Sequence, residues 1–419
     1  MNLESQIRNI AKRAKGVVSV ASQLSTEKKN ALLRTMAQSL LTSKEAIHQA
    51  NAKDLEGGKK KGLSKALLDR LTLTDDRIQQ MAEGLEEVAA LPDPVGQITR
   101  SWDRPSGLRV QKMRIPLGVI LMIYESRPNV TVDAAGLCLK AGNVVVLRGG
   151  SEAIHSNRIL TKILREACEE KDISPDIIQI VSTTKRQALK WLVQQNKYID
   201  LAIPRGGEGL MKWMGDHSKI PFVKHDKGTC HVYVDDEALL EMAIDISFNS
   251  KVQRPGVCNA METLLVHEKI APKFLSPMVK KFKEAGVTLK GCPKTCSLIP
   301  GLKRATEKDW PQEYLDLILS IKTVSSTDEA IQHIRKYGSS HTEVIVTESE
   351  STAKKFIHAL DSSMIGWNCS TRFNDGGQLG LGAEIGISTT KLHAFGPMGL
   401  EELTAEKFVV LGKGQIRTR

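Results

Sequence analysis

A cysteine in a turn is the first candidate for chemistry in this 419-residue chain. Cys258 follows a Pro-Gly pair and lies four residues after Arg254. A thiol near cationic groups and free backbone N–H groups has a lowered pKa, and its thiolate is a nucleophile. From the residues alone, the alternative is a small buried apolar side chain. We expect that alternative for Cys138, Cys168 and Cys230, which lie in apolar or strand-like settings.

Two Arg-Gly-Gly segments indicate a second kind of chemistry, the binding of a phosphate. Arg148-Gly149-Gly150-Ser151 and Arg205-Gly206-Gly207 each follow a short apolar run and precede a helical pattern. Glycine lets the backbone approach a phosphate, a helix N-terminus favours an anion, and arginine pairs with one. The alternative is that each Gly-Gly is only a tight turn, since the sequence holds no GxGxxG motif.

The N-terminal region that must support these residues is helical by periodicity. Residues 1–100 carry repeated apolar stripes, and Leu91-Pro92-Asp93-Pro94 breaks the pattern. Thr42 and Glu45, three residues apart, predict a capping box that starts a helix. The first fifteen residues predict a folded amphipathic helix, not a transit peptide.

A hairpin and then alternating strands and helices follow. Residues 101–113, around Arg104-Pro105-Ser106-Gly107, predict the hairpin. Beyond residue 115, short apolar runs with helical crossovers predict a parallel α/β sheet with ligands at the strand C-termini. A second α/β block begins near Gly228. The predicted strands are 119–123, 143–147, 178–181, 199–203, 262–266, 343–347 and 364–367, and the predicted helices of the second block are 271–285 and 351–360.

Composition and charge narrow the class of protein. The chain is 41% hydrophobic and 26% charged, which excludes a collagenous or wholly disordered chain and favours two domains. The net charge of +11 is dispersed, with its densest run, Lys59, Lys60 and Lys61, expected in a loop. We therefore predict a solvated basic surface that favours anionic ligands, and no nucleic-acid partner.

The cysteines and the hydropathy indicate the compartment. Seven cysteines form no CxxC, and the closest pair, Cys292 and Cys296, lacks the further ligands of a zinc site. No apolar run reaches about 18 residues. We expect a cytoplasmic protein with unpaired thiols, no metal and no membrane partner.

The order of segments resembles the aldehyde dehydrogenase superfamily and, within it, the glutamate-5-semialdehyde dehydrogenase family of proline biosynthesis. The resemblance covers nearly the whole chain. The segments that carry it are 115–119, 124–133, 139–143, 147–153, the Cys258 loop, 337–343 and 394–400.

The resemblance implies an aldehyde dehydrogenase-like α/β fold, with two parallel-sheet domains and a small β-hairpin element for oligomerisation. Residues 1–100 and 115–227 would bind NADP(H), and residues 228–399 would form the catalytic domain. Residues 101–114 and 400–419 would build the interface of a homodimer or higher homo-oligomer.

The resemblance also implies roles for single residues. Cys258 would be the nucleophile, and the Asn129 amide would stabilise the oxyanion. Arg148 would contact the adenosine ribose, and Glu313 would contact the nicotinamide ribose. Arg127, His225, Arg254 and His341 would bind the substrate or its phosphate, and Gly149, Gly150, Ser151, Arg205, Gly206 and Gly207 would complete the cofactor site. From the residues alone, the alternative for Asn129 is a place in a turn that ends a strand, and the alternative for Glu313 is a residue that caps the apolar segment after it.

One departure from the wider superfamily concerns hydrolysis. Hydrolytic members carry a glutamate before a Gly-Gly turn as general base, whereas the matching stretch here is Lys224-His225-Asp226-Lys227-Gly228. A thioacyl enzyme that exchanges with phosphate needs no activated water, so the departure fits acyl phosphate chemistry. The alternative for His225 is a structural surface histidine.

The implied reaction is the NADPH-dependent reduction of L-glutamyl 5-phosphate, with a functional hand-off from glutamate 5-kinase. Two other functions fit the same residues. A CoA-acylating aldehyde dehydrogenase also lacks the deacylating glutamate. A regulatory or basic nucleic-acid-binding protein could have kept the fold without its activity.

Overall fold

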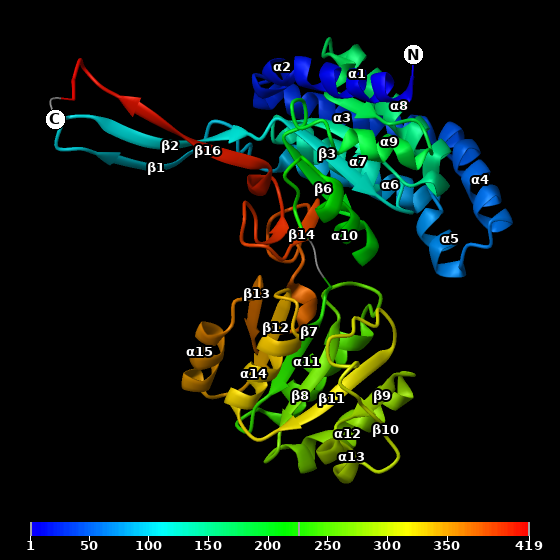
Figure 1. Cartoon of the computed structure of the whole chain (residues 1–419), viewed down its shortest axis with the longest axis vertical. Coiled ribbons are helices and arrows are strands. Elements are labelled where there is room, and N and C mark those ends of the chain that lie inside the picture. The colour runs from blue at the N-terminus through cyan, green and yellow to red at the C-terminus, as the bar shows by residue number, and fades with distance from the viewer. Residues whose placement is uncertain (1, 225–226, 418–419) are drawn as a thin grey trace. The chain divides into compact units, whose positions relative to one another are not determined.

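The computed structural model describes residues 2–224 and 227–417, and the chain divides into two units (Figure 1). Unit 1 comprises residues 1–224, 381–386 and 398–419, and unit 2 comprises residues 225–380 and 387–397. Each unit has its own parallel sheet, so each is described by itself. His225, one of the candidate phosphate-binding residues, lies outside the described residues.

Unit 1 is built on a four-stranded parallel sheet in the order β5-β4-β3-β6. Its central strands β3 and β4 are buried along their whole length, as continuous apolar runs require in a sheet covered on both faces. All four strands predicted between residues 115 and 205 are confirmed, with shifts of one or two residues at their ends. The strands are β3 (Val119–Tyr124), β4 (Val144–Arg148), β5 (Ile178–Ile180) and β6 (Leu201–Arg205).

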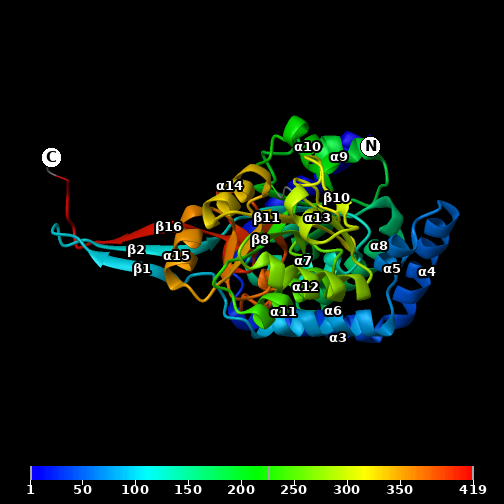
Figure 2. The ribbon, with the colours of Figure 1, turned by 90° about the horizontal axis from the view of Figure 1, so that it is seen from below.

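Helices cover both faces of this sheet. On one face α7 and α8 contact the strands, and α3 and α6 lie side by side behind them (Figure 2). On the other face α1 packs against β4, β5 and α9. The helices of unit 1 are α1 (Leu3–Gly16), α2 (Val18–Ser22), α3 (Thr26–Thr42), α4 (Lys44–Lys60), α5 (Lys65–Leu71), α6 (Asp75–Ala90), α7 (Val130–Lys140), α8 (Ile154–Glu170), α9 (Arg186–Leu192) and α10 (Glu208–His217).

Two local predictions in the helical region are wrong. Thr42 does not begin a helix but ends α3, and its hydroxyl donates to the carbonyls of Gln38 and Ser39. The next helix starts at Lys44 without a side-chain cap. The lysine run is not a loop either, since Lys59 and Lys60 form the last turn of α4, where cations are favourable near the helix C-terminus. Every described helix is too short or too polar to span a bilayer.

A three-stranded antiparallel ribbon extends from the rest of unit 1, as Figure 1 shows at the left. The predicted hairpin is confirmed as β1 (Ile98–Asp103) and β2 (Arg109–Pro116), and β16 (Thr404–Leu411) pairs with β2. Gly107 has a φ of +80° in the hairpin turn, a conformation that favours glycine. Trp102 of β1 meets Phe408 of β16 edge to face, with ring centroids 6.3 Å apart.

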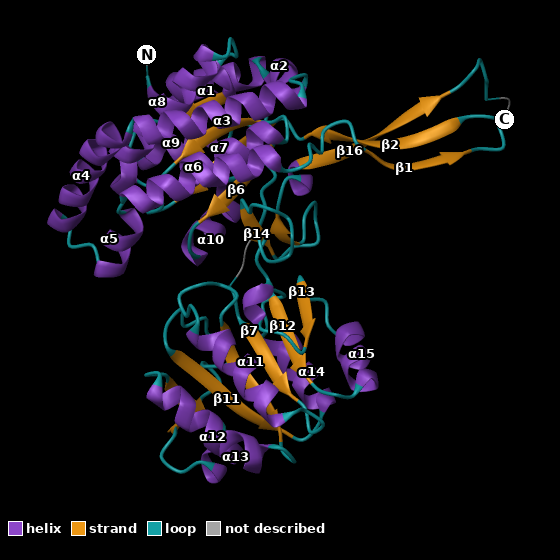
Figure 3. Ribbon diagram, turned by 180° about the vertical axis from the view of Figure 1, so that it is seen from behind, coloured by secondary structure: helices purple, strands orange, loops and turns teal. Residues whose placement is uncertain are grey.

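Unit 2 is built on a seven-stranded parallel sheet in the order β10-β9-β11-β8-β7-β12-β13 (Figure 3). Residues of α11 and α12 form one apolar core against it, and residues of α14 and α15 form another on the opposite face. The strands are β7 (Cys230–Val234), β8 (Met261–His267), β9 (Thr288–Gly291), β10 (Lys303–Arg304), β11 (Ile318–Val324), β12 (Thr342–Val346) and β13 (Met364–Trp367), and the helices are α11 (Leu240–Val252), α12 (Ala271–Glu284), α13 (Pro293–Leu298), α14 (Thr327–Tyr337) and α15 (Glu350–Ala359).

The three strands and two helices predicted for the second block are confirmed as β8, β12, β13, α12 and α15. Strands β7, β9, β10 and β11 and helices α11, α13 and α14 were not predicted. Short 3₁₀ helices and a two-stranded sheet complete the chain: η1 (Ser151–Ala153), η2 (Pro175–Ile177), η3 (Thr371–Phe373), η4 (Glu401–Leu403), β14 (Gly386–Ser388) and β15 (Gly396–Met398).

Candidate active site

Cys258 lies in the loop between α11 and β8 of unit 2, and its side chain is partly exposed. The N–H of Ala260 donates to the Val257 carbonyl at 3.1 Å and closes a turn around the thiol residue. The Cys230 thiol of β7 donates to the Cys258 carbonyl at 3.1 Å. The loop is therefore held against the sheet, and Cys258 remains partly exposed.

Gly228 fixes the backbone of Cys258 from a second side. A Cβ atom at position 228 would lie 2.2 Å from the Cys258 carbonyl oxygen, so only glycine fits. The Gly228 N–H donates to Glu313 Oε1 at 2.9 Å. The structure therefore brings Glu313, the residue predicted at the nicotinamide ribose, next to the Cys258 loop of the same unit.

His341 lies behind the loop, fully buried. Its Nδ1 is 2.7 Å from Thr342 Oγ1 and 3.7 Å from Cys230 Sγ. Since the Cys230 thiol also reaches the Cys258 carbonyl, the Cys230 side chain lies between His341 and the nucleophile loop. His341 is thus linked to the Cys258 loop through Cys230. From the sequence, His341 was expected to bind the substrate or its phosphate, and in the structure its side chain is buried.

Arg254 and Arg372 form the cationic side of the Cys258 loop. Arg254 is exposed, and Arg372 Nε donates to the side-chain oxygen of its neighbour Gln253 at 2.8 Å. Burial and then the positive charge of Arg254 lower the pKa of Arg372. Sequence reasoning found Arg254 but missed Arg372, because the two are separated by more than a hundred residues and no local pattern links them.

In unit 1, a pocket of about 80 Å³ gathers three of the predicted residues, Arg127, Asn129 and Arg205. They come from the segments that follow β3 and end β6, so the carboxyl edge of the sheet brings them together. The Asn129 amide donates to Asp133 Oδ2 at 2.9 Å, and burial raises the pKa of Asp133 to about 6. The pocket is lined by Arg127, Asn129, Val130, Asp133, Ala134, Arg205, Glu384 and Ile385.

Arg148 ends β4 at the same edge of that sheet and is only 9% exposed. Its Nη1 donates to the Gly149 carbonyl, and its buried Nε has no hydrogen-bond partner among the described residues. Burial lowers the pKa of Arg148, and the negative charge of Glu152 opposes that effect. A buried guanidinium with an unsatisfied N–H fits a ligand that brings an acceptor oxygen, such as a nucleotide.

The glycines after Arg148 lie close to neighbouring side chains. A Cβ at Gly149 would lie 2.0 Å from the Asn157 amide, and one at Gly150 would lie 2.1 Å from Glu152 Oε1. Ser151 is exposed at the start of the 3₁₀ turn that leads into α8. At the end of β6, Gly206 is similarly crowded by Leu210, whereas Gly207 is open.

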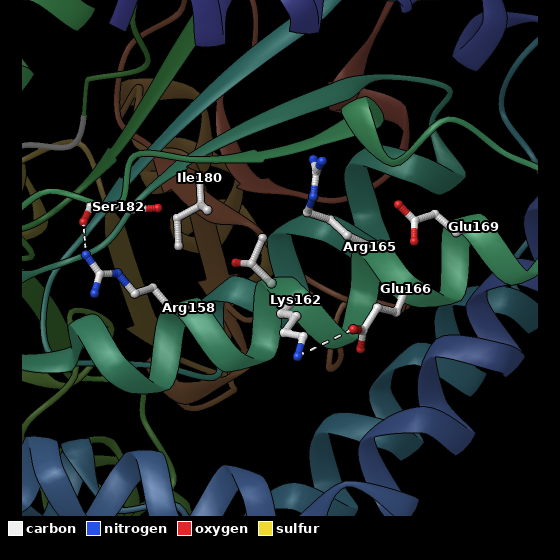
Figure 4. A pocket seen from close by; sticks show the side chains of 8 residues that line it. Arg158, Lys162, Arg165, Glu166, Glu169, Ile180 and Ser182 are labelled. Atoms are coloured by element: carbon white, nitrogen blue, oxygen red, sulfur yellow. Dashed lines mark hydrogen bonds and ion pairs between the residues drawn. The ribbon is translucent and has the colours of Figure 1, made fainter. Parts of the chain in front are cut away.

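A larger hollow of about 380 Å³ runs along α8 beside β5 and contains none of the predicted residues (Figure 4). Arg158 donates to the Ser182 carbonyl at one end, and Lys162 pairs with Glu166 at 3.6 Å. Arg158, Lys162, Arg165 and Glu166 thus already have partners in the backbone or in one another. Among the described residues, no group of three or more His, Cys, Asp or Glu side chains is arranged to hold a metal ion.

The three cysteines expected to be structural are buried. Burial raises the pKa of the Cys138 and Cys230 thiols, and it raises that of Cys168 to about 12. These thiols stay protonated at neutral pH. Cys258 therefore differs from them in exposure as well as in its neighbours.

Comparison with known proteins identifies the family. The aldehyde dehydrogenase family model matches residues 2–295. The chain is 56% identical over 417 residues to the gamma-glutamyl phosphate reductase of Desulforapulum autotrophicum, with 100% of each chain covered. The crystal structure of gamma-glutamyl phosphate reductase from Thermotoga maritima matches with a TM-score of 0.96 and 45% identity, over 98% of this chain and 99% of that one.

A more distant structure shares only the fold. The acetylating aldehyde dehydrogenase of Geobacillus thermoglucosidasius is 18% identical, with a TM-score of 0.70 over 100% of this chain and 98% of that one. The expected aldehyde dehydrogenase-like α/β fold, with two parallel sheets and an antiparallel ribbon, is thus confirmed. The chain is an oxidoreductase that belongs to the aldehyde dehydrogenase family, in the branch of the gamma-glutamyl phosphate reductases.

Proposed function

We propose that the protein reduces L-glutamyl 5-phosphate to L-glutamate 5-semialdehyde and phosphate with NADPH, the second step of proline biosynthesis from glutamate. The observation that carries the proposal is the partly exposed Cys258 with two arginines beside its loop. The names of the full-length relatives support the substrate. Family membership supports a nicotinamide cofactor.

The reaction begins at the Cys258 sulfur. The thiolate attacks the γ-acyl carbon, the carbon–oxygen bond to phosphate breaks, and phosphate leaves with the electron pair. When bound, the nicotinamide cofactor would supply the hydride that the thioacyl carbon accepts. The resulting oxyanion then re-forms the carbonyl, the carbon–sulfur bond breaks, and the semialdehyde leaves.

Two groups would stabilise the oxyanion, namely the Asn129 amide and the backbone N–H of Cys258. Removing one such donor typically costs about 2.7–4 kcal/mol of transition-state stabilisation. Arg148, Gly149, Gly150, Ser151 and the residues 205–207 would hold the cofactor in unit 1, and Glu313 would hold its nicotinamide ribose. The buried Nε of Arg148 supports that assignment.

The stretch between the two sheets lacks the carboxylate of hydrolytic relatives at the matching place. It offers Lys224 and Lys227 instead, with His225 at the position of the general base. General-base help is typically worth about 10²–10⁴-fold in rate. In the reverse, oxidative direction, the thioacyl enzyme would therefore react with phosphate instead of water, because phosphate needs no deprotonation by the protein.

The test is the reverse reaction followed as NADP reduction with glutamate semialdehyde. We expect about one turnover per active site in phosphate-free buffer and continuous turnover with phosphate or arsenate. Steady turnover without phosphate, yielding free glutamate, would refute the acyl phosphate assignment. Turnover that needs CoA and ignores phosphate would identify a CoA-acylating enzyme.

We also propose that the ribbon forms the interface of a homodimer. Ribbon residues Phe408, Val410 and Leu411 are 64%, 54% and 49% exposed, an apolar surface that a second copy would cover. The seven cysteines form no disulfide among the described residues, which supports residence in the reducing cytoplasm. Sedimentation of the full chain against a Phe408→Lys variant checks the interface, and an unchanged mass would refute it.

A further inference from the structure

The segment around η3 brings a distant arginine to the Cys258 loop. The Thr371 N–H donates to Ser250 Oγ at 3.2 Å, and the Ser250 and Ser370 hydroxyls are 3.1 Å apart. On the other side, the Asn259 amide donates to the Asn374 carbonyl at 2.9 Å. These bonds fasten residues 370–374 to the end of α11 and to the residue that follows Cys258.

Arg372 is held in this segment with its guanidinium beside Arg254. Its Nε donates to Gln253 Oε1 at 2.8 Å, and Gln253 is the neighbour of Arg254 in sequence. The negative charge of Asp375 raises the pKa of Arg372 and so opposes the effect of Arg254, but among the described residues no ion pair within 4.0 Å joins a carboxylate to either guanidinium. Two adjacent guanidinium groups without a carboxylate in direct contact favour the binding of an anion between them.

The chemistry at Cys258 identifies that anion. In the substrate of the proposed function, the phosphoryl group is one oxygen atom away from the carbon that the thiolate attacks. The α-carboxylate lies at the far end of the glutamyl chain. A pair of guanidinium groups suits the several oxygens of a phosphoryl dianion and stabilises it as it leaves.

We propose that Arg372, together with Arg254, binds the phosphoryl group of the substrate beside Cys258. The inference rests on the proposed function and adds a substrate-binding residue to it. In the forward direction the pair stabilises phosphate as the carbon–oxygen bond breaks. In the reverse direction it holds phosphate while one phosphate oxygen attacks the thioacyl carbon and the thiolate leaves.

The first experiment compares Arg372→Gln with the wild-type chain in semialdehyde oxidation. Losing one charge-assisted contact should raise the KM for phosphate by about tenfold or more. Arg304→Gln, which changes an exposed arginine of β10 in the same unit, is the matched control and should leave that KM unchanged. A raised KM for the semialdehyde with an unchanged KM for phosphate would overturn the proposal, because Arg372 would then bind the α-carboxylate.

The second experiment needs no turnover. Inorganic phosphate should slow the alkylation of Cys258 by neutral iodoacetamide in the wild type, and this protection should need about tenfold more phosphate in Arg372→Gln. Arg372→Lys should retain part of the protection because it keeps the charge. Protection in Arg372→Gln equal to that of the wild type would overturn the inference.

Gln253→Ala separates phosphate binding from a purely structural role. It removes the bond to Arg372 Nε and keeps both charges, so its KM for phosphate should stay below that of Arg372→Gln. Equal effects of the two changes would show that Arg372 only fastens the loop, and would overturn the proposal. A wild type that needs no phosphate for turnover refutes the proposed function itself, whereas the protection assay tests Arg372 alone.

Discussion

The Asn129 side-chain amide donates a 2.9 Å hydrogen bond to Oδ2 of Asp133, one helical turn further along α7. One of the two amide hydrogens is thereby fixed, and in the proposed reaction the other would face the oxyanion. Burial raises the pKa of Asp133 to about 6, so the carboxylate that orients Asn129 titrates near neutral pH. The proposed oxyanion donor thus has a positioning residue that can be tested separately.

We expect Asp133→Ala to lower kcat by about tenfold with little change in KM, because the Asn129 amide loses its orientation. The wild-type kcat should also fall as pH drops through about 6, where Asp133 takes up a proton and accepts a weaker bond. The variant should lack that limb of the pH profile. Asp216→Asn, an exposed aspartate of α10, is the control, and a retained limb in Asp133→Ala would contradict the assignment.

The same carboxyl group should appear in stability measurements. Its folded pKa lies above the unfolded value near 3.9, so its contribution to stability is present below about pH 4 and is lost as pH rises through about 6. Asp133→Asn should therefore gain up to about 3 kcal/mol relative to the wild type between pH 4 and pH 8. Urea unfolding at the two pH values checks this difference, and a parallel pH dependence of the two proteins would argue against it.

Replacement of the nucleophile gives the third prediction. Cys258→Ala should abolish turnover, because it removes the nucleophile. The fold and cofactor binding should persist, because Cys258 lies in a partly exposed loop and not in the hydrophobic core. In the wild type, iodoacetamide should modify Cys258 far faster than the other six cysteines. Cys296→Ala, also partly exposed in unit 2, should keep full activity. Activity of Cys258→Ala within tenfold of the wild type would exclude the assignment.

Cofactor choice gives the fourth prediction, which concerns Arg148. The planar guanidinium suits a 2′-phosphate, so Arg148→Ala should weaken NADPH binding by about tenfold more than NADH binding. Fluorescence titration with both cofactors measures the two losses. Arg158→Ala, in the hollow of Figure 4, is the control. Equal losses for NADPH and NADH would show that Arg148 does not read the 2′-phosphate and would leave Arg205 as the alternative reader.

A buried ion pair below the Cys258 loop gives the last prediction. Lys251 Nζ and Glu262 Oε2 are 2.8 Å apart and fully buried, and Glu262 Oε1 accepts the Leu315 N–H at 3.1 Å. Glu262→Gln should lower the free energy of unfolding by about 3 kcal/mol, because Lys251 would remain buried without its carboxylate. Changing both Lys251 and Glu262 to Met should recover most of the lost free energy of unfolding. Urea unfolding of the three proteins measures this, and a fully stable Glu262→Gln would contradict it.

The parts of the fold predictable from sequence are those with strong local signals. The apolar runs that became β3 and β4 are buried on both faces, so composition alone marks them as strands. The hairpin turn at Gly107 is equally local. The Thr42 capping box failed because its pattern is short and the preceding helix α3 extends through Thr42.

The candidate site was only partly predictable, because only some of its residues lie close together in the sequence. Cys258 and Arg254 share a turn, so their spacing was visible in the sequence. Arg372 and the Gly228–Glu313 bond depend on strands that pair across unit 2, and Asp133 matters only because the start of α7 turns it toward Asn129. The Asn129–Asp133 contact joins residues four apart at the start of one helix, so a helix predicted over 130–140 would have indicated it. The other two relationships join segments that are distant in sequence.

The packing of Gly228 has a consequence for how the protein tolerates mutation. A side chain there would collide with the Cys258 carbonyl, so any replacement displaces the loop of the nucleophile. In a library of random variants selected for growth without proline, position 228 should be as invariant as position 258. Such a screen would mark a residue without a side chain as essential, and its essential property would be the volume that it leaves empty.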